Sequence, residues 1–207
     1  MKALTLSNLP ENKLGQRRGG IEDLVVAIKG LQVNSTCQII AISGFGGAGK
    51  STTALRLVIE LQEASAVPVD LFIQNRLQDR GSGWTGFDWE RLRREVLEPA
   101  RNGAETVSYG VYDWNRNGIF ETRTLIFPKY LIIEGVGLLK PELMKYFDLS
   151  VWIDVPIEKA RDRAMKRDKE QQFTDNDDEW LNHWSVRDRE NFESFRPDKL
   201  ADFILEN

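Results

Sequence analysis

The sequence has little cysteine and histidine and no long apolar run. Its 207 residues include one cysteine, Cys37, and one histidine, His183. One cysteine cannot form a disulfide within the chain, which is typical of a protein from a reducing compartment. No apolar segment approaches the roughly 18 residues that a membrane-spanning helix requires, and Asn8, Pro10 and Glu11 interrupt any signal-peptide core. We therefore expect a cytoplasmic protein without a membrane partner.

The chain also lacks an excess of basic charge. It contains 28 lysines and arginines against 32 aspartates and glutamates, which gives a net charge of −4. Proteins that bind nucleic acid polymers depend on many Lys and Arg side chains to neutralise phosphates. The balance therefore disfavours a nucleic acid partner and leaves a small molecule as the expected ligand. It is compatible with a homo-oligomer.

Short apolar runs alternate with amphipathic segments along the chain. The first 19 residues are polar and show no periodicity, so we expect a flexible arm at 1–19 and a single domain at 20–207. Buried strands are predicted at 38–42, 67–73, 130–134, 149–153 and 202–205. Helices are predicted at 21–31, 50–64, 88–101, 156–169 and up to about 195, with a short one after Pro141. This alternation predicts an α/β fold with a doubly wound, mostly parallel sheet flanked by helices. Additional features are a small β-hairpin, 106–112 with 119–127, and a lid segment at about 160–178.

A glycine-rich segment between a predicted strand and a predicted helix carries the strongest motif. It fits G-x-x-x-x-G-K-[ST] at every position and comprises Gly44, Phe45, Gly46, Gly47, Ala48, Gly49, Lys50 and Ser51, followed by Thr52. Small residues let the backbone wrap a triphosphate with its N–H groups inward, while Lys50 reaches the terminal phosphates and Ser51 ligates Mg²⁺. A turn that only joins a strand to a helix would explain the glycines but not the Lys-Ser pair. We therefore predict a nucleotide-binding loop.

Two acidic residues lie in or at the end of apolar strands near this loop. Asp70 interrupts the strand at 67–73, where a carboxylate can act as the general base that accepts the proton of an attacking hydroxyl. Glu134 closes the apolar run 130–133, and an acid at that place is typical of an Mg²⁺ ligand. The alternatives are a solvated strand-end acid for Asp70 and a loop acid or helix-cap partner for Glu134.

Two arginines, Arg163 and Arg167, share a face of the helix predicted after Pro156. Guanidinium groups on a mobile segment can close over phosphates and stabilise the charge of the transferring group. The alternative is a solvated basic face paired with Glu158 and Asp162. Neither D-x-x-G nor N-K-x-D follows the glycine-rich loop, which disfavours a GTPase switch.

The order of these motifs resembles the uridine kinase / phosphoribulokinase family of P-loop kinases, from about Ile21 onward. The segments that match family motifs are Gly44–Thr52, Asp70–Phe72, Phe87–Asp88, Val111–Asp113, Leu131–Val136, Asp148–Asp154 with Arg163 and Arg167, and Pro197 with Ala201–Ile204. The resemblance implies a nucleoside-kinase-like P-loop fold with ATP as phosphate donor and Mg²⁺ as cofactor. It also implies an acceptor hydroxyl on a small molecule such as a nucleoside.

The same resemblance implies roles for single residues. Asp70 is the expected catalytic base and Glu134 is expected near Mg²⁺, whereas Tyr112 is expected against the acceptor. The catalytic set is Asp70, Lys50, Arg163 and Arg167. The expected acceptor-binding residues are Asp70, Phe72, Trp84, Asp88 and Tyr112. Trp84 is included because an indole offers a stacking face, although packing against the neighbouring helix is an alternative use of the same ring.

Departures from the family pattern concentrate where the acceptor is selected. Family members that phosphorylate uridine carry D-H-P before the substrate helix, where this chain has GWTGFDWE at 83–90. They carry a histidine after the motif at 111–113, where this chain has WNRN at 114–117, and Ala164 replaces a second lid arginine. One alternative is a nucleotide-binding regulatory protein that transfers no phosphate. Another is a nucleoside monophosphate kinase, whose acceptor phosphate would need arginines such as Arg76, Arg80, Arg91, Arg94, Arg116 and Arg123.

Overall fold

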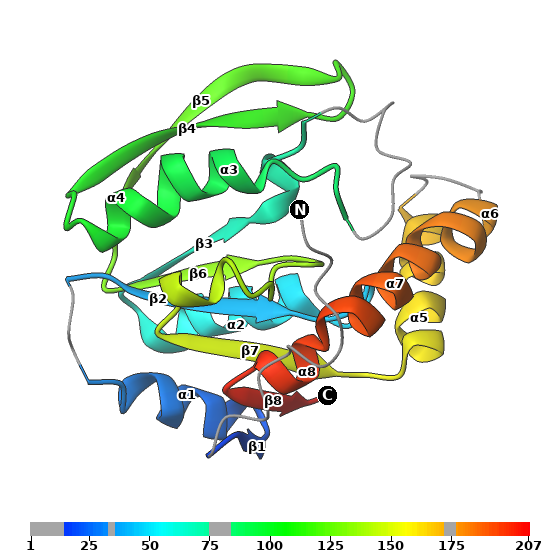
Figure 1. Ribbon diagram of the computed structural model, residues 1–207, viewed down its shortest axis with the longest axis horizontal. Coiled ribbons are helices and arrows are strands. Elements are labelled where there is room, and N and C mark those ends of the chain that lie inside the picture. Colours follow the sequence, from blue (N-terminus) through cyan, green and yellow to red (C-terminus); the bar gives the residue numbers. More distant parts are fainter. Residues whose placement is uncertain (1–14, 33–35, 75–83, 172–176) are drawn as a thin grey trace.

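Six parallel strands form the centre of the structure, with helices on both faces (Figure 1). The computed structural model describes residues 15–32, 36–74, 84–171 and 177–207. In spatial order the strands are β1 Arg17–Gly19, β8 Phe203–Glu206, β7 Leu149–Asp154, β2 Gln38–Ser43, β6 Tyr130–Glu134 and β3 Ala64–Pro68. Every pairing in this sheet is parallel, so the predicted α/β fold is confirmed. The carboxyl ends of the strands therefore meet at one edge, where ligands bind in such folds.

Alternate side chains of the central strand β2 supply two separate hydrophobic cores. Ile39 and Ala41 pack on one face of the sheet, whereas Ile40 and Ile42 pack on the other. All four are fully buried because β2 pairs with strands on both sides and is covered by helices on both faces. A strand buried on both faces reads as a continuous apolar run, which is the pattern of residues 38–42.

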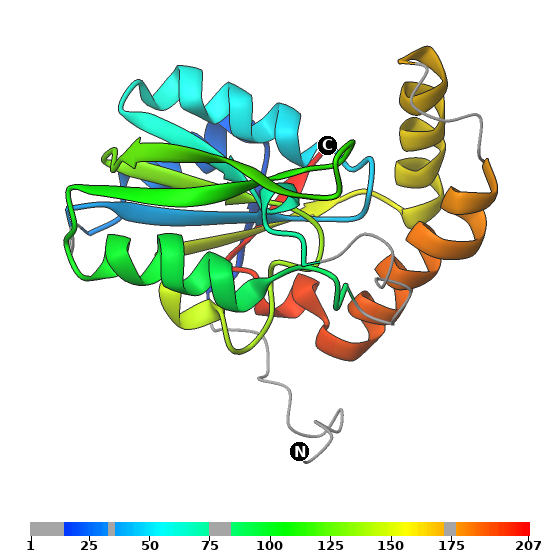
Figure 2. The same ribbon diagram turned by 90° about the horizontal axis from the view of Figure 1, so that it is seen from above.

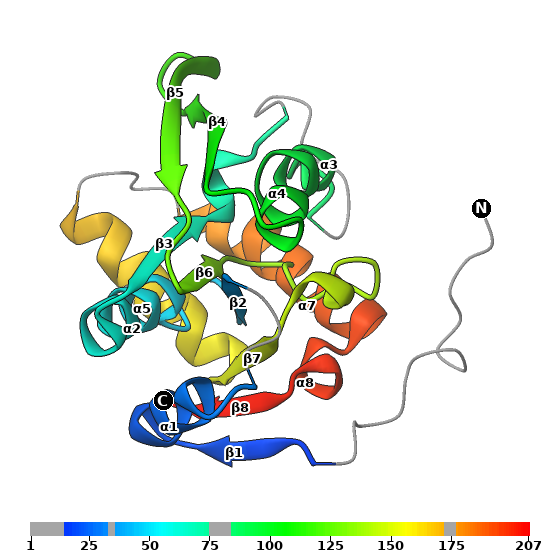
Figure 3. The ribbon, with the colours of Figure 1, turned by 90° about the vertical axis from the view of Figure 1, so that its left-hand side faces the viewer.

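The helices form two layers, one on each face of the sheet (Figures 2 and 3). The layer over Ile40 and Ile42 contains α1 Ile21–Lys29, α2 Lys50–Leu61 and α5 Ile157–Glu170. The opposite layer contains a helix made of α3 Trp89–Leu92, a π turn Arg93–Leu97 and α4 Glu98–Arg101. It also contains a helix made of α6 Asp177–Glu179, a π turn Trp180–Trp184 and α7 Ser185–Phe195, followed by α8 Pro197–Leu200.

The predicted hairpin lies outside the main sheet, beside α3 and α4 (Figure 1). It consists of the antiparallel strands β4 Thr106–Asp113 and β5 Gly118–Ile126. Arg91 holds it in place, because its guanidinium donates to the backbone oxygens of Gly110 (2.9 Å) and Leu71 (2.7 Å). This buried side chain joins the hairpin to the turn that follows β3.

Two element assignments differ from the sequence-based prediction. The strand predicted at 67–73 ends at Pro68, and Val69–Leu71 forms a 3₁₀ turn. β3 lies at the edge of the sheet, and Pro68 is paired with Glu134, the last residue of β6, so the ladder has no partner strand to continue along. The helix predicted after Pro141 is a short 3₁₀ turn, Met144–Tyr146.

Part of the predicted N-terminal arm belongs to the sheet. Residues 1–14 lie outside the described part of the chain, but Arg17–Gly19 forms β1 and pairs with β8. The prediction of a flexible arm is therefore wrong for residues 17–19. Backbone pairing requires no apolar pattern, and side chains add to it: Gln16 donates to two backbone oxygens near β8, and Arg18 pairs with Asp154 at 2.9 Å.

In the ranges that the structure describes, no helix combines the length and the apolar character needed to cross a membrane. Cys37 is buried directly before β2. Burial raises the pKa of its thiol to about 11, so Cys37 acts as a core residue rather than as a nucleophile.

Leu57 and Leu55 form a matched pair for testing which face of α2 packs on the sheet. Leu57 is fully buried, whereas Leu55 is 62% exposed. We expect Leu57→Ala to lower the free energy of unfolding by about 2–5 kcal/mol because it leaves a cavity. Leu55→Ala should change it by less than about 0.5 kcal/mol. Equilibrium urea unfolding measures both values, and equal losses would contradict this packing.

Candidate active site

The glycine-rich segment Gly44–Ser51, here called the phosphate loop, runs from the end of β2 into the first turn of α2 at the carboxyl edge of the sheet. Gly47 has a φ of 85°, and a Cβ added to it would lie 2.0 Å from the backbone oxygen of Ala160 in α5. Only glycine fits there. Ser43 Oγ donates to the backbone oxygen of Gly135 at 2.9 Å, which attaches the start of the loop to the end of β6. The loop is thus enclosed between α5 and the segment that follows Glu134.

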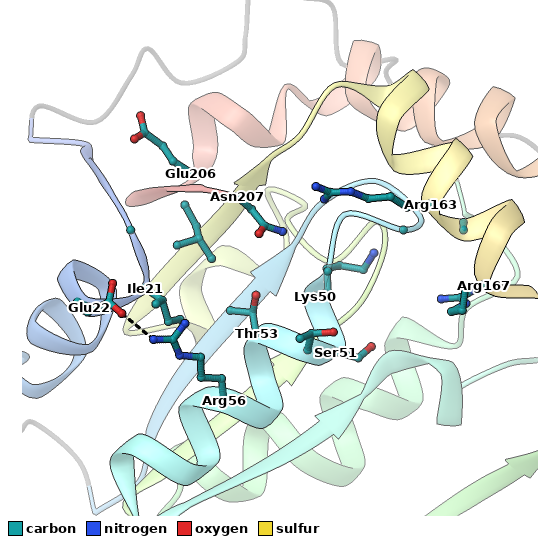
Figure 4. A pocket seen from close by; sticks show the side chains of 16 residues that line it. Ile21, Glu22, Lys50, Ser51, Thr53, Arg56, Arg163, Arg167, Glu206 and Asn207 are labelled. Atoms are coloured by element: carbon teal, nitrogen blue, oxygen red, sulfur yellow. Dashed lines mark hydrogen bonds and ion pairs between the residues drawn. The ribbon is translucent and has the colours of Figure 1, made fainter. Parts of the chain in front are cut away.

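A pocket of ≈ 670 Å³ opens in front of the phosphate loop (Figure 4). Its walls come from the loop, the first turns of α2, the middle of α5, the start of α1 and the end of β8. The α1 and β8 walls include Glu22, which pairs with Arg56 at 2.6 Å, and Asn207, whose amide donates to the Ala48 backbone oxygen at 2.9 Å. The volume is in the range of small-molecule sites. No motif in the sequence pointed to the contribution of α1 and β8.

Lys50 is buried at the first position of α2, and its Nζ donates to the backbone oxygen of Phe45 at 2.9 Å. Burial lowers the pKa of its ammonium group. The negative charges of Asp188, Glu134 and Asp70 act in the opposite direction. These carboxylates favour the charged form, which is the form that can bind phosphate.

Ser51 and Glu134, the two predicted metal ligands, lie next to each other. Ser51 Oγ donates to Glu134 Oε1 at 3.0 Å, and Glu134 is buried at the end of β6. Burial raises the pKa of Glu134, Lys50 lowers it and Asp70 raises it further. This pair fits Mg²⁺, which binds few protein oxygens and completes its shell with water and phosphate. Among the described residues, no group of three or more Asp, Glu, His or Cys side chains forms a metal cage, so phosphate and water would have to supply the other ligands.

Asp70 lies on the 3₁₀ turn directly beyond β3, at the same edge of the sheet. Its side chain is open to solvent on one side and crowded by protein atoms on the other. This crowding raises the pKa of its carboxyl group, whereas Lys50 and Arg167 lower it. The two cations favour the ionised form that a general base requires. An isolated solvated acid would lack these neighbours.

Arg163 and Arg167 project from α5 into the wall of the pocket (Figure 4). Between them in the sequence, Ala164 is buried, with its Cβ 2.9 Å from the position that a Cβ on Gly47 would take. A lid arginine is replaced at this position because α5 packs directly on the phosphate loop. The lid predicted at 160–178 comprises most of α5, α6, and residues 172–176, which lie outside the described part.

Phe72 and Asp88, two predicted acceptor residues, have clear packing and capping roles. Phe72 is buried and stacks on Tyr109 with ring centroids 5.7 Å apart. Asp88 caps α3 by accepting the backbone N–H of Arg91 at 2.9 Å. Both lie close to the turn that carries Asp70, because the Asp88 N–H donates to the Phe72 backbone oxygen at 2.7 Å. Contact with an acceptor stays a prediction for both.

Tyr112 and Trp84, the other two predicted acceptor residues, are also buried. The hydroxyl of Tyr112 donates to the side chain of Asn117 at the tip of the hairpin. The ring of Trp84 stacks on Trp184, with centroids 5.5 Å apart and 11° between planes. Trp84 is therefore a packing residue, but its partner is Trp184 and not the helix after Asp88 that the sequence suggested. Contact of Trp84 and Tyr112 with an acceptor stays a prediction.

Asp188 of α7 is a residue of the site that the sequence analysis missed. It is 4% exposed, and its carboxylate accepts the backbone N–H of Gly46 at 2.6 Å and the indole N–H of Trp84 at 3.1 Å. Burial raises its pKa to about 6. The signal that could have found Asp188 was its spacing. It lies four residues after Trp184, which lies four residues after Trp180, so all three share one face of a helix.

A parallel α/β sheet, a phosphate loop with its Lys-Ser pair, and acids at the ends of the two adjoining strands define a P-loop kinase. The sequence is 30% identical over 152 residues to the uridine kinase of Mannheimia succiniciproducens, which covers 67% of this chain and 70% of that protein. It is 27% identical over 154 residues to the uridine kinase of Vibrio atlanticus, covering 67% and 71% of the two chains. The chain belongs to the uridine kinase-like family of P-loop kinases.

Solved structures show the same fold at lower identity. A possible uridine kinase from Bacillus stearothermophilus superposes with a TM-score of 0.69 at 21% identity, covering 89% of this chain and 96% of that one. D-glycerate 3-kinase from Cryptococcus neoformans superposes with a TM-score of 0.60 at 9% identity, covering 90% and 92%. No protein-family model matches the chain.

Lys50→Ala tests the phosphate loop without any assumption about the acceptor. Loss of the ammonium group should weaken MgATP binding by about tenfold or more, as expected for a lost charged contact. Lys166→Ala is the control, because that side chain on α5 is 79% exposed and pairs with Glu170. Isothermal titration calorimetry measures both affinities. Wild-type affinity in the Lys50 variant would refute the assignment of the loop.

Asp188 should give the folded protein a pH dependence whose sign follows from burial. Its pKa of about 6 lies above the ordinary value of 3.8, so its contribution to stability is greatest at low pH and is lost as the pH rises toward 6. Asp188→Asn removes this loss. The free energy of unfolding of the variant relative to wild type should therefore rise with pH, by up to about 3 kcal/mol. Urea unfolding at several pH values measures the difference, and a flat or falling curve would contradict it.

Proposed function

We propose that the protein transfers the γ-phosphate of ATP to a hydroxyl group of a small molecule. The observation that carries this proposal is the position of Asp70. Its carboxylate is open to solvent, and the positive charges of Lys50 and Arg167 both act on it. Those two cations also line the pocket in front of the phosphate loop. A base and the groups suited to a terminal phosphate are therefore neighbours, as phosphoryl transfer to a hydroxyl requires.

In this reaction Asp70 takes the proton of the acceptor hydroxyl while its oxygen attacks the γ-phosphorus. The new P–O bond forms as the bond to the β-phosphate oxygen breaks, and ADP leaves. Lys50 and the N–H groups of the phosphate loop hold the β- and γ-phosphates. Arg163 and Arg167 stabilise the negative charge that spreads over the transferring group. Asp70 then releases its proton to solvent.

Ser51 and Glu134 are the residues that would hold Mg²⁺ together with ATP. When bound, the ion neutralises charge on the phosphate oxygens. Burial raises the pKa of Glu134, and a cation beside it would favour its ionised form. The side chain of Ser51 is exposed toward the pocket, so its hydroxyl can turn from Glu134 toward such an ion.

A nucleoside is the first acceptor to test, because the curated relatives are uridine kinases. The acceptor region nevertheless differs from the family pattern at 83–90 and 114–117. In this chain Trp114 packs edge to face on Tyr112 with centroids 5.4 Å apart, where the pattern has a polar histidine nearby. A more apolar wall favours an acceptor other than uridine, so sugars and other alcohols belong in the same test.

A nucleoside monophosphate acceptor is less well supported, because the arginines near the hairpin already have partners. In the described part of the chain, Arg91 donates to two backbone oxygens. Three further arginines each form an ion pair with an acid: Arg94 with Glu95, Arg116 with Asp113, and Arg123 with Glu121. An acceptor phosphate would have to displace these partners. Arg76 and Arg80 lie outside the described residues.

Asp70→Asn separates binding from chemistry. The amide keeps the size of the side chain but cannot accept the proton, so MgATP affinity should stay near wild type while kcat falls by about 10²–10⁴. Asp198→Asn should leave both values unchanged, because this acid lies in α8 and pairs with Arg196. Steady-state kinetics and calorimetry measure the two effects. Unchanged turnover would remove Asp70 from the mechanism.

The function itself is tested by conversion of ATP to ADP in the presence of a panel of acceptors. Nucleosides, nucleoside monophosphates, sugars and pantothenate-like alcohols form the panel, and the product is identified by mass. Conversion that depends on an alcohol acceptor supports the proposal. Conversion with a monophosphate alone supports the alternative kinase. ATP binding without conversion on any acceptor supports a regulatory protein.

A further inference from the structure

The helix at Asp177–Phe195 presents one stripe of side chains to the phosphate loop and to Trp84. It runs through α6, the π turn Trp180–Trp184 and α7, and the stripe consists of Trp180, Trp184, Asp188 and Phe192 at four-residue intervals. Three of these side chains are aromatic and one is acidic. Burying a single carboxylate in an apolar stripe costs free energy unless the carboxylate is hydrogen-bonded, so the groups that donate to Asp188 matter.

The aromatic members of the stripe pack closely on the phosphate loop and on Trp84. A Cβ added to Gly46 would lie 2.7 Å from the ring of Trp180, so the indole covers the backbone at that glycine. The rings of Phe192 and Phe45 have centroids 5.3 Å apart. Trp184 stacks on Trp84. The stripe therefore touches two segments that are distant in sequence, the phosphate loop and the segment Trp84–Asp88 on the acceptor side.

Asp188 is the point at which these two segments share a polar contact. One carboxylate oxygen accepts the N–H of Gly46 at 2.6 Å, and the other accepts the indole N–H of Trp84 at 3.1 Å. Both hydrogen bonds are buried, where a charged acceptor forms strong bonds. The negative charge of this carboxylate also raises the pKa of Lys50, and it does so more than the charges of Glu134 and Asp70.

Trp84 occupies a backbone conformation that it would not adopt without such contacts. Its φ is 60°, in the left-handed region that large side chains avoid. The residue is nevertheless 5% exposed, stacked on one side and hydrogen-bonded at the indole N–H. Tertiary contacts of this kind are what maintain strained residues at functional sites.

We propose that Asp188 is a positioning residue that ties the phosphate loop to the segment Trp84–Asp88, so that the nucleotide side and the acceptor side of the site respond to each other. Nucleotide binding at the loop then orders the acceptor wall through this carboxylate. The kinetic part of this inference rests on the proposed function. The structural part requires only that nucleotide binds.

Hydrogen–deuterium exchange of the full chain with and without MgADP tests the tie directly. In the wild type, MgADP should slow exchange in peptides that cover 44–52 and in peptides that cover 84–88. In Asp188→Ala, exchange of both segments should be faster before nucleotide is added, and MgADP should then slow only 44–52. Equal nucleotide protection of 84–88 in variant and wild type, or none in the wild type, would overturn the tie.

A double-mutant cycle between Asp188 and Trp84 tests the kinetic consequence. Asp188→Ala should lower kcat by about 10- to 100-fold and Trp84→Phe by a smaller factor, while the double variant should be no slower than Asp188→Ala. Additive losses would show independent roles and overturn the proposal. Asp188→Asn keeps one acceptor oxygen and should not lower the melting temperature at neutral pH, while it loses part of kcat. If the melting temperature and kcat of this variant fall in proportion, the role of Asp188 is merely structural.

Asp148→Asn provides the matched control for this cycle. Asp148 also accepts a backbone N–H, that of Ile39 at 2.7 Å, but it lies at the opposite edge of the sheet. This change should lower the melting temperature, leave kcat within about twofold, and leave the effect of Trp84→Phe undiminished. If wild type converts no ATP with any acceptor, the proposed function fails, and the exchange experiment still decides the role of Asp188.

Discussion

The rest of the site depends on keeping the buried amino group of Lys50 charged. Burial lowers its pKa, and three carboxylates, Asp188, Glu134 and Asp70, oppose this effect from three different elements. Burial raises the pKa of the Glu134 and Asp188 carboxyl groups, crowding by protein atoms raises that of Asp70, and Lys50 lowers all three. Charges of both signs are therefore held in low-dielectric surroundings, where a polyphosphate and its metal ion interact more strongly than in water.

Close packing around the phosphate loop explains one departure of this chain from the family pattern, Ala164. Gly47 lies against Ala160 and Ala164 of α5, which leaves no space for an arginine at position 164. On the other side, Trp180 of the π turn before α7 covers Gly46. The loop is thus held between α5 and the helix at Asp177–Phe195, and the same helix also contacts Trp84 through Trp184 and Asp188.

Local patterns predicted much of the fold and of the phosphate site. The phosphate loop is one continuous segment, so its glycines and Lys-Ser pair are visible in sequence, and buried parallel strands read as apolar runs. Glu134 was predictable for the same reason, because it ends such a run. The edge strand β1 was not, since backbone pairing leaves no side-chain pattern. Nor was the end of β3 at Pro68, because the length of the partner strand determines where the ladder stops.

The sequence by itself determined that this protein binds a phosphate chain, because the loop, the lysine and the first turn of α2 are adjacent along the backbone. Only the tertiary structure decided which other groups face that loop. Asp188 is 142 residues from Gly46 and 104 from Trp84, yet it bonds to both. Spacing in the sequence can place a residue on one face of a helix. Which residues that face contacts depends on how helices and strands pack, so the contacts of Asp188 arise only on folding.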